Sequence, residues 1–176
     1  MPTTLNPSKG YQSLRRGRIS QEGREYFVTF CTRDRQSGLT SEKIAQGISR
    51  EISSLETDAT WVSRCAVIMP DHVHLLIRLG NKLTLGRAIA RLKAKSVGFL
   101  KTANLRWQEG FHEHRLRPHE MRLPVFLYTY LNPYRAGLIP LDSQWPWFYC
   151  SKADSDRFLP MLSEELPEPA WLGELP

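Results

Sequence analysis

Hydrophobic and polar positions change their spacing several times along the chain, and each change predicts a new element. Segments 25–32, 60–69 and 72–79 are rich in β-branched and aromatic residues, which is typical of strands. The last two are separated only by Pro70 and Asp71, a pair that favours a turn. We therefore expect segments 60–69 and 72–79 to form a β-hairpin.

Apolar residues spaced three and four apart predict two helices, over 40–57 and 84–101. Thr40 or Ser41 is suited to cap the start of the first. The apolar residues that define these helices are Ile44, Ile48, Ile52 and Leu55, and then Leu85, Ile89, Leu92 and Phe99. Segment 111–117 alternates polar and apolar residues and predicts a fourth strand.

A last helix is expected to start near Pro124, which suits a first helical turn, and to end near Gly137, which suits a C-terminal cap. The predicted order is β-α-β-β-α-β followed by this helix. That order indicates an α+β protein with a ferredoxin-like split βαβ sheet. Because this fold hosts many activities, it does not decide the function.

We expect three parts: a basic arm (1–24), a folded central domain (25–139) and an irregular, surface-wrapping tail (140–176). Residues 1–152 hold 23 Lys and Arg against 12 Asp and Glu, a net charge of +11. Residues 153–176 hold one against six, a net charge of −5. A basic body favours a polyanionic partner, most often nucleic acid, although a generic basic surface explains the charge equally well.

The three cysteines are scattered and form no CxxC pair, which argues against a disulfide framework or a cysteine-rich zinc site. The N-terminus lacks the apolar core of a signal peptide, and no apolar run approaches the length of a membrane span. We therefore expect no membrane partner and a location in the cytoplasm.

His72 and His74 are the most informative pair for chemistry. Residues i and i+2 of a strand point to the same face, so two imidazoles so placed can hold one metal ion. The intervening Val73 is expected to point into a core on the opposite face. A His-x-His pair alone is a weak signal, and two ordinary surface histidines are the alternative.

The segment MPDHVHLLIRL around this pair resembles the histidine-hydrophobic-histidine (HUH) motif of single-tyrosine transposases. The similarity extends to the REP-associated tyrosine transposases through YQSLRRGR, YFVTFCTRDR, WQEGFHEHRLR, YTYLNPYRAGLI and WPWFYCS. Together these segments cover most of residues 11–151, in the order of that family, whereas 152–176 has no counterpart.

The resemblance assigns three residues of the last helix. It implies that Tyr128 is the nucleophile and that Asn132 is the third metal ligand, beside His72 and His74, through its amide oxygen. The spacing agrees, because positions i and i+4 share a helix face, and Arg135 at i+7 could contact a phosphate from that face. Such a ligand set suits Mg²⁺ or Mn²⁺ better than zinc.

Other residues could take these roles. Tyr130 and Tyr134 are rival nucleophiles, but packing with a polar tip is the simpler role for both. His112 and His114 also have i, i+2 spacing and could contact DNA or metal, or could be polar residues of a strand face.

The activity that the resemblance implies is cleavage and rejoining of single-stranded or hairpin DNA, including REP-like palindromes, through a 5′-phosphotyrosine. The residues expected to contact DNA are Arg15, Arg16 and Arg18 of the arm, Arg87, Arg91, Lys93 and Lys95 of helix 84–101, and Arg135. A solvated helix face is the alternative for the stripe in helix 84–101. A homodimer is an open alternative, with Tyr128 acting in cis or in trans.

Two functions without transposition are also consistent with the sequence. A ferredoxin-like sheet could bind nucleic acid by stacking bases on Tyr26, Phe27 and Phe30, without any chemistry. A domesticated relative could bind its repeats and move nothing.

Overall fold

The computed structural model describes residues 20–162 and 170–174. The arm residues Arg15, Arg16 and Arg18 lie outside this part of the chain. Strands β1, β2, β3 and β4 alternate with helices α2, α3 and α4 in the expected β-α-β-β-α-β-α order. The predicted ferredoxin-like arrangement is therefore confirmed.

Five antiparallel strands form one sheet in the order β4-β1-β3-β2-β5. Strands β1 to β4 are arranged as a split βαβ sheet, in which β3 lies between β1 and β2. Their bounds are Glu25–Cys31 for β1, Trp61–Ile68 for β2, His72–Leu79 for β3, His112–Arg115 for β4 and Phe148–Cys150 for β5.

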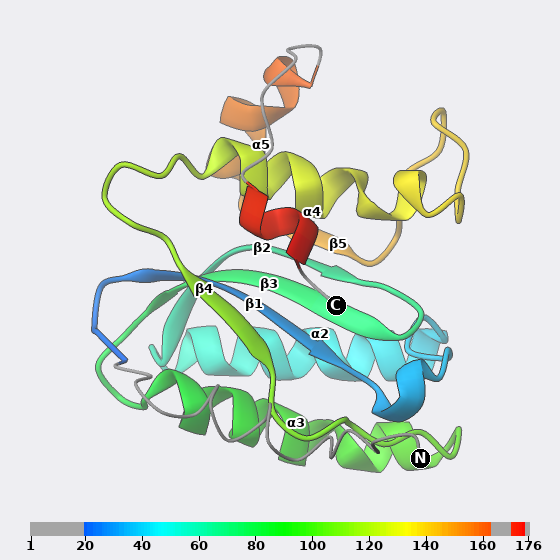
Figure 1. Ribbon diagram of the computed structural model, residues 1–176. Coiled ribbons are helices and arrows are strands. Elements are labelled where there is room, and N and C mark those ends of the chain that lie inside the picture. The colour runs from blue at the N-terminus through cyan, green and yellow to red at the C-terminus, as the bar shows by residue number, and fades with distance from the viewer. Residues whose placement is uncertain (1–19, 163–169, 175–176) are drawn as a thin grey trace, which may run out of the picture.

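Helices cover both faces of this sheet (Figure 1). Helices α2 (Glu42–Thr57) and α3 (Leu85–Lys101) lie on one face, and α4 (Leu123–Arg135) lies across the other. The short helix α5 (Lys152–Phe158) packs on the α4 side. The short 3-10 segments are η1 (Arg33–Arg35), η2 (Leu159–Met161) and η3 (Ala170–Glu174).

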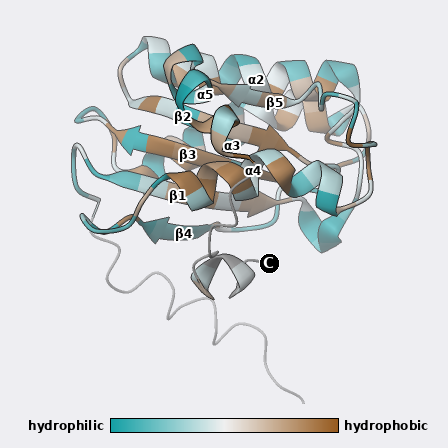
Figure 2. Cartoon of the chain, turned by 90° about the horizontal axis from the view of Figure 1, so that it is seen from above, coloured by the Kyte–Doolittle hydropathy of each residue, from teal (hydrophilic) through white to brown (hydrophobic). Residues whose placement is uncertain are grey.

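The two faces bury different residues because successive side chains of a strand point to opposite sides. Tyr26, Val28 and Phe30 of β1 pack with α2 and α3 in the larger core. Phe27 points the other way and packs under α4 with Leu76. Figure 2 shows the resulting hydrophobic band along the central strands and α4.

This packing corrects one alternative drawn from the sequence. Tyr26, Phe27 and Phe30 are exposed by only 2%, 0% and 1%, so none of them offers a surface on which a base could stack. Their strand is predicted correctly, but the alternating pattern does not show that helices cover both faces.

The helix ends agree closely with the expected signals. Helix α2 starts after Ser41 rather than Thr40, although the Ser41 side chain makes no capping hydrogen bond. Pro124 lies in the first turn of α4. Gly137 follows the end of α4 with a φ of +65°, a conformation that glycine adopts without strain.

Part of the expected irregular tail is regular. Strand β5 pairs with β2 and extends the sheet beyond residue 139, and α5 follows directly. The Ser151 hydroxyl accepts a hydrogen bond from the backbone N–H of Asp154 and so caps α5. Short elements that depend on pairing with a distant strand leave little local signal, which explains why the sequence does not reveal them.

Among the described residues, no helix combines the length and the apolar character that crossing a membrane requires.

Candidate active site

The histidine pair lies at the start of β3, directly after the β2–β3 turn. Both side chains point to the face covered by α4, and Val73 points into the opposite core, as expected. His72 is 9% exposed and His74 is 1% exposed, so neither is an ordinary surface histidine.

The two imidazoles face each other through the same ring atom. Nε2 of His72 lies 3.0 Å from Nε2 of His74. Each Nδ1 is held by a different partner: that of His72 lies 2.6 Å from Oδ1 of Asp71, and that of His74 lies 2.7 Å from Oγ1 of Thr29. Asp71 is held in turn by Arg35, whose Nε lies 3.0 Å from Oδ2.

Burial favours the neutral form of both rings. It is the largest cause lowering the pKa of His72, and it lowers the pKa of His74 well below 6.5. When each Nδ1–H donates to its partner, both Nε2 lone pairs point to one place, and a single cation satisfies both. Without a cation, His74 can carry its proton on Nε2 and donate it to His72.

The 3.0 Å between the two Nε2 atoms is an ordinary hydrogen-bond distance, and a cation could take the place of the shared proton. Among the described residues, no group of three or more His, Cys, Asp or Glu side chains could hold a metal, so a third protein ligand would have to be another residue type.

Tyr128 lies in the middle of α4, directly over the pair. Its ring centroid is 5.3 Å from that of His74 and 6.1 Å from that of Phe27, both with the edge of one ring toward the other. The side chain is half-buried. One chain therefore brings the tyrosine and both histidines together.

Asn132 lies one helical turn after Tyr128 and is half-buried. Its backbone carbonyl accepts a hydrogen bond from the N–H of Ala136. Its position agrees with the expected face of α4, and its role as a ligand stays a prediction. Arg135 is exposed at the end of the same helix.

The rival tyrosines pack elsewhere. Tyr130 stacks on Phe126 and meets the edge of Phe148, and burial raises the pKa of its phenol. The Tyr134 hydroxyl donates to the backbone carbonyl of Ser143 at 2.9 Å. Both residues thus have the packing role expected for them, away from the histidine pair.

The second His-x-His pair lies on β4, separated from β3 by β1. Thr29 is the register partner of both His112 and His74, which places the two histidines two strand spacings, about 10 Å, apart. The His114 ring stacks on the Trp171 indole with centroids 3.7 Å apart, and its Nε2 lies 2.9 Å from Oε2 of Glu120. The two pairs therefore do not form one cluster.

The basic residues expected in α3 lie on the opposite face of the sheet from Tyr128. Arg87 and Lys95 are exposed there, and Arg91 forms an ion pair with Asp58 at 2.8 Å. The Lys93 ammonium donates to the carbonyls of Gln108 and Gly110, and burial lowers its pKa to about 8. The structure does not bring these side chains to the tyrosine and histidines.

Sequence reasoning missed the residues that orient the two rings. It indicates Asp71 only as a turn residue, and Thr29 only as part of a strand. A carboxylate next to a candidate ligand histidine is the available signal for Asp71. Thr29 has none, because its partner is 45 positions away and the register of β1 on β3 alone joins them.

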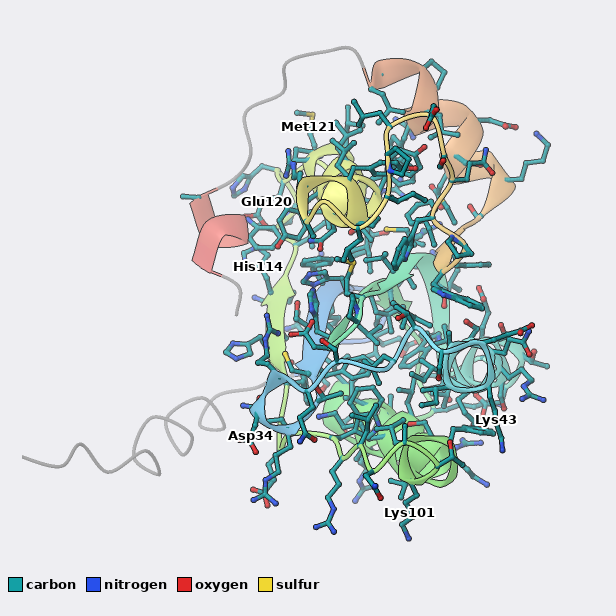
Figure 3. The ribbon with its side chains drawn as sticks, turned by 90° about the vertical axis from the view of Figure 1, so that its right-hand side faces the viewer. Asp34, Lys43, Lys101, His114, Glu120 and Met121 are labelled. Carbon is teal, nitrogen blue, oxygen red and sulfur yellow. The ribbon has the colours of Figure 1, made fainter. Side chains whose placement is uncertain are left out.

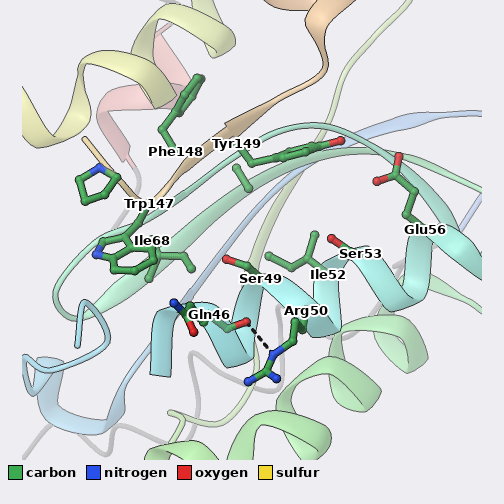
Figure 4. Close-up of a pocket in the computed structure, with 12 residues that line it drawn as sticks. Gln46, Ser49, Arg50, Ile52, Ser53, Glu56, Ile68, Trp147, Phe148 and Tyr149 are labelled. Atoms are coloured by element: carbon green, nitrogen blue, oxygen red, sulfur yellow. Dashed lines mark hydrogen bonds between the residues drawn. The ribbon is translucent and has the colours of Figure 1, made fainter. Parts of the chain in front are cut away.

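A separate cavity of about 450 Å³ lies between α2 and β5 (Figure 4). It is lined by residues such as Ser49, Trp147 and Tyr149, and it does not include the histidine pair.

Comparisons with known proteins bear on the family and the fold. The family described as "Transposase IS200 like" matches residues 20–115. A solved REP-associated tyrosine transposase bound to a REP hairpin is 25% identical, with a TM-score of 0.64, over 74% of this chain and 79% of that one. A Deinococcus radiodurans protein described as a candidate transposase is 21% identical, with a TM-score of 0.46, over 59% and 85%. No curated protein matches.

The family match spans more than half of the chain and includes the histidine pair. It also confirms the resemblance drawn from the sequence segments. This chain belongs to the IS200-like transposase family.

Proposed function

We propose that the protein cuts and rejoins single-stranded or hairpin DNA, with Tyr128 as the nucleophile and a divalent metal held by His72, His74 and Asn132. The observation that supports this most strongly is that the Nε2 atoms of the two buried imidazoles lie 3.0 Å apart, with the Tyr128 ring packed against His74. When each Nδ1 carries its proton, both Nε2 lone pairs are available to one cation.

Tyr128 attacks the scissile phosphorus through its phenolic oxygen. The bond from phosphorus to the 3′ oxygen of the preceding nucleotide breaks, which leaves a 5′-phosphotyrosine and a free 3′-OH. The phenol of a tyrosine has an ordinary pKa near 10 and must lose its proton during the attack. Because one phosphoester replaces another, rejoining requires no ATP.

His72, His74 and Asn132 would hold Mg²⁺ or Mn²⁺. When bound there, the ion would act as a Lewis acid on the scissile phosphate and neutralise developing charge on its oxygens. The protein orients the two imidazoles through Asp71 and Thr29 and excludes water from His74 by burial. Arg135, at the end of α4, is the candidate for a contact to a phosphate oxygen.

The substrate class is supported by the solved relative, whose DNA is a REP hairpin. The basic body of this chain is consistent with a polyanion. We assign single-stranded or hairpin DNA, including REP-like palindromes, as the partner.

The test is formation of a covalent protein–DNA adduct. Purified protein is incubated with 5′-labelled and 3′-labelled DNA hairpins carrying single-stranded flanks, with Mn²⁺, with Mg²⁺ or with EDTA. We expect a denaturant-resistant adduct that carries the 3′ portion of the strand, only when metal is present. Tight binding without an adduct on any hairpin would instead establish a binding module or a domesticated relative.

The substitution Asp71→Asn tests how the first imidazole is oriented. It removes the carboxylate that fixes the Nδ1 proton of His72, but it preserves the shape of the side chain. Loss of such a partner lowers metal affinity by about 10- to 100-fold. We expect that fall in a Mn²⁺ titration, with adduct formation restored at higher Mn²⁺. Unchanged affinity would mean that Asp71 serves the turn alone. Asp58→Asn, on the far side of the sheet, is the matched control.

A further inference from the structure

A groove next to the start of α4 is lined by four arginines from four different parts of the chain. It encloses about 510 Å³ and is bordered by Arg24 before β1, Arg117 after β4, Arg122 at the start of α4 and Arg157 in α5. Its apolar floor includes Leu116 and Phe158, which belong to the core under α4. The groove therefore lies on the same face of the sheet as Tyr128.

One of the four arginines already balances a carboxylate of the groove. Arg122 pairs with Glu25 at 3.6 Å, and Arg64, outside the groove, pairs with the same carboxylate at 3.2 Å. Glu120 already pairs with His114 and accepts from the backbone N–H of Arg117 at 2.6 Å.

The side chains of Arg24, Arg117 and Arg157 are exposed, and within the described residues none of them forms an ion pair. Arg157 packs over the Phe158 ring. All three guanidinium groups are exposed to solvent, and the charge of Arg117 also acts on Glu120, which lines the same groove.

The first turn of α4 adds to this field. It contains no acidic residue, so the partial positive charge of the helix start is not compensated from within the helix. Figure 3 shows Glu120 and Met121 beside this end of α4, and Lys101 of α3 on the far side of the sheet.

We propose that Arg24, Arg117 and Arg157 form a binding groove for the DNA backbone, which holds the strand on one side of the cleaved linkage. Two observations support the DNA backbone as the occupant. The groove is positively charged, and it borders the same helix, α4, that carries Tyr128. Leu123, which lines the groove, and Tyr128 are five positions apart in α4, which is about 7.5 Å along the helix axis. A phosphate held in the groove would therefore lie close to the cleaved linkage.

This assignment rests on the proposed function in one respect, since Tyr128 defines the cleaved linkage. The groove also explains how DNA could be held without α3, whose basic residues lie on the opposite face. Arg117 and Arg157 carry no signal in the sequence, because they come from a loop and a tail that the fold alone places together.

The experiment measures binding separately from chemistry. All variants are made in a Tyr128→Phe background, and a labelled hairpin with single-stranded flanks is titrated at several salt concentrations. Arg24, Arg117 and Arg157 are changed to Gln singly and together. Arg50→Gln, an exposed arginine of α2 on the other face, is the matched control. Thermal melting checks that each variant is folded, and the single variants remain informative if the triple variant is not.

We expect the triple variant to bind more weakly and its log–log salt slope to fall by roughly 2 to 3, about 0.7 to 0.9 for each lost contact. Neutral methylphosphonates are placed one at a time along the strand near the cleaved linkage, and at least one position should weaken binding of the parent and leave the triple variant unaffected. Unchanged affinity and slope in a folded triple variant would overturn the groove. If the parent protein bound none of the hairpins, the proposed DNA groove would be overturned as well.

The two proposals fail in different ways. If the unmodified protein, which retains Tyr128, forms its adduct but the arginine variants bind DNA normally, only the groove proposal is wrong. If the arginine variants lose affinity but no adduct ever forms, the groove stands and the chemistry is wrong.

Discussion

Replacing Tyr128 with Phe should abolish the covalent adduct while leaving DNA binding intact. The change removes only the phenolic oxygen, so the ring keeps its edge contacts with His74 and Phe27. Loss of a covalent nucleophile lowers the rate by several orders of magnitude, which places the adduct below detection. The measurement is a denaturing gel of labelled hairpin with Mn²⁺, together with a binding titration of the same variant.

Tyr130→Phe and Tyr134→Phe are the matched controls, because both tyrosines lie on the same helix. Tyr130→Phe should keep the full yield of adduct. Tyr134→Phe also loses the hydrogen bond to Ser143, which costs about 1 kcal/mol of stability, and should still form the adduct. An adduct that survives Tyr128→Phe and disappears in either control would assign the nucleophile to that control residue.

Replacing His72 or His74 should remove metal-dependent cleavage. Each ring supplies one of two converging Nε2 atoms, so either change leaves a site with a single imidazole. We expect Mn²⁺ affinity to fall at least about 100-fold, beyond the range for loss of an orienting partner. His72→Ala is preferred, because it is the more exposed of the two, and His74→Gln avoids a large buried cavity.

The measurement combines a Mn²⁺ titration with the adduct assay, and binding of DNA in EDTA should not change. His114→Ala is the control, because His114 lies on β4 and its ring pairs with Glu120, which follows that strand. If His114→Ala lost metal binding and His72→Ala did not, the metal site would lie on β4. If neither His72→Ala nor His74→Gln lowered the cleavage rate, the metal site would be refuted.

Mixing the Tyr128→Phe and His72→Ala proteins tests the assembly. Tyr128 and the histidine pair meet within one chain, so the mixture should remain inactive. Recovery of the adduct would mean that a homodimer completes the site in trans.

The sequence predicts the fold well because its signals are local. Ile44, Ile48 and Ile52 repeat at helical spacing, and HVHLLIRL has the composition of a buried strand. Pro70 and Asp71 separate two such strands by a turn too short for anything but a hairpin. The β-α-β-β-α-β order follows from the spacing of these apolar residues. The segments that resemble the family lie in the same stretches of the chain.

The candidate site is predicted only in part. The i, i+2 spacing of His72 and His74 places them on one face, and the resemblance points to Tyr128. The covering of that face by α4, and therefore the burial of His74 under Tyr128, depends on residues that are more than 50 positions apart. No local pattern encodes such a contact.

By itself, then, the sequence determined which residues share a strand face or a helix face, because these periods are set by backbone geometry within a few residues. Only the tertiary structure decided which faces meet. The pairing of β1 with β3 brings Thr29 to His74, and the turn brings Asp71 to His72, so the two rings are oriented toward one point. The packing of α2 and α3 against one face, and α4 against the other, separated Arg87 and Lys95 from Tyr128 and buried Tyr26, Phe27 and Phe30. These outcomes depend on the free energy of burying apolar surface across distant segments, which short-range spacing cannot specify.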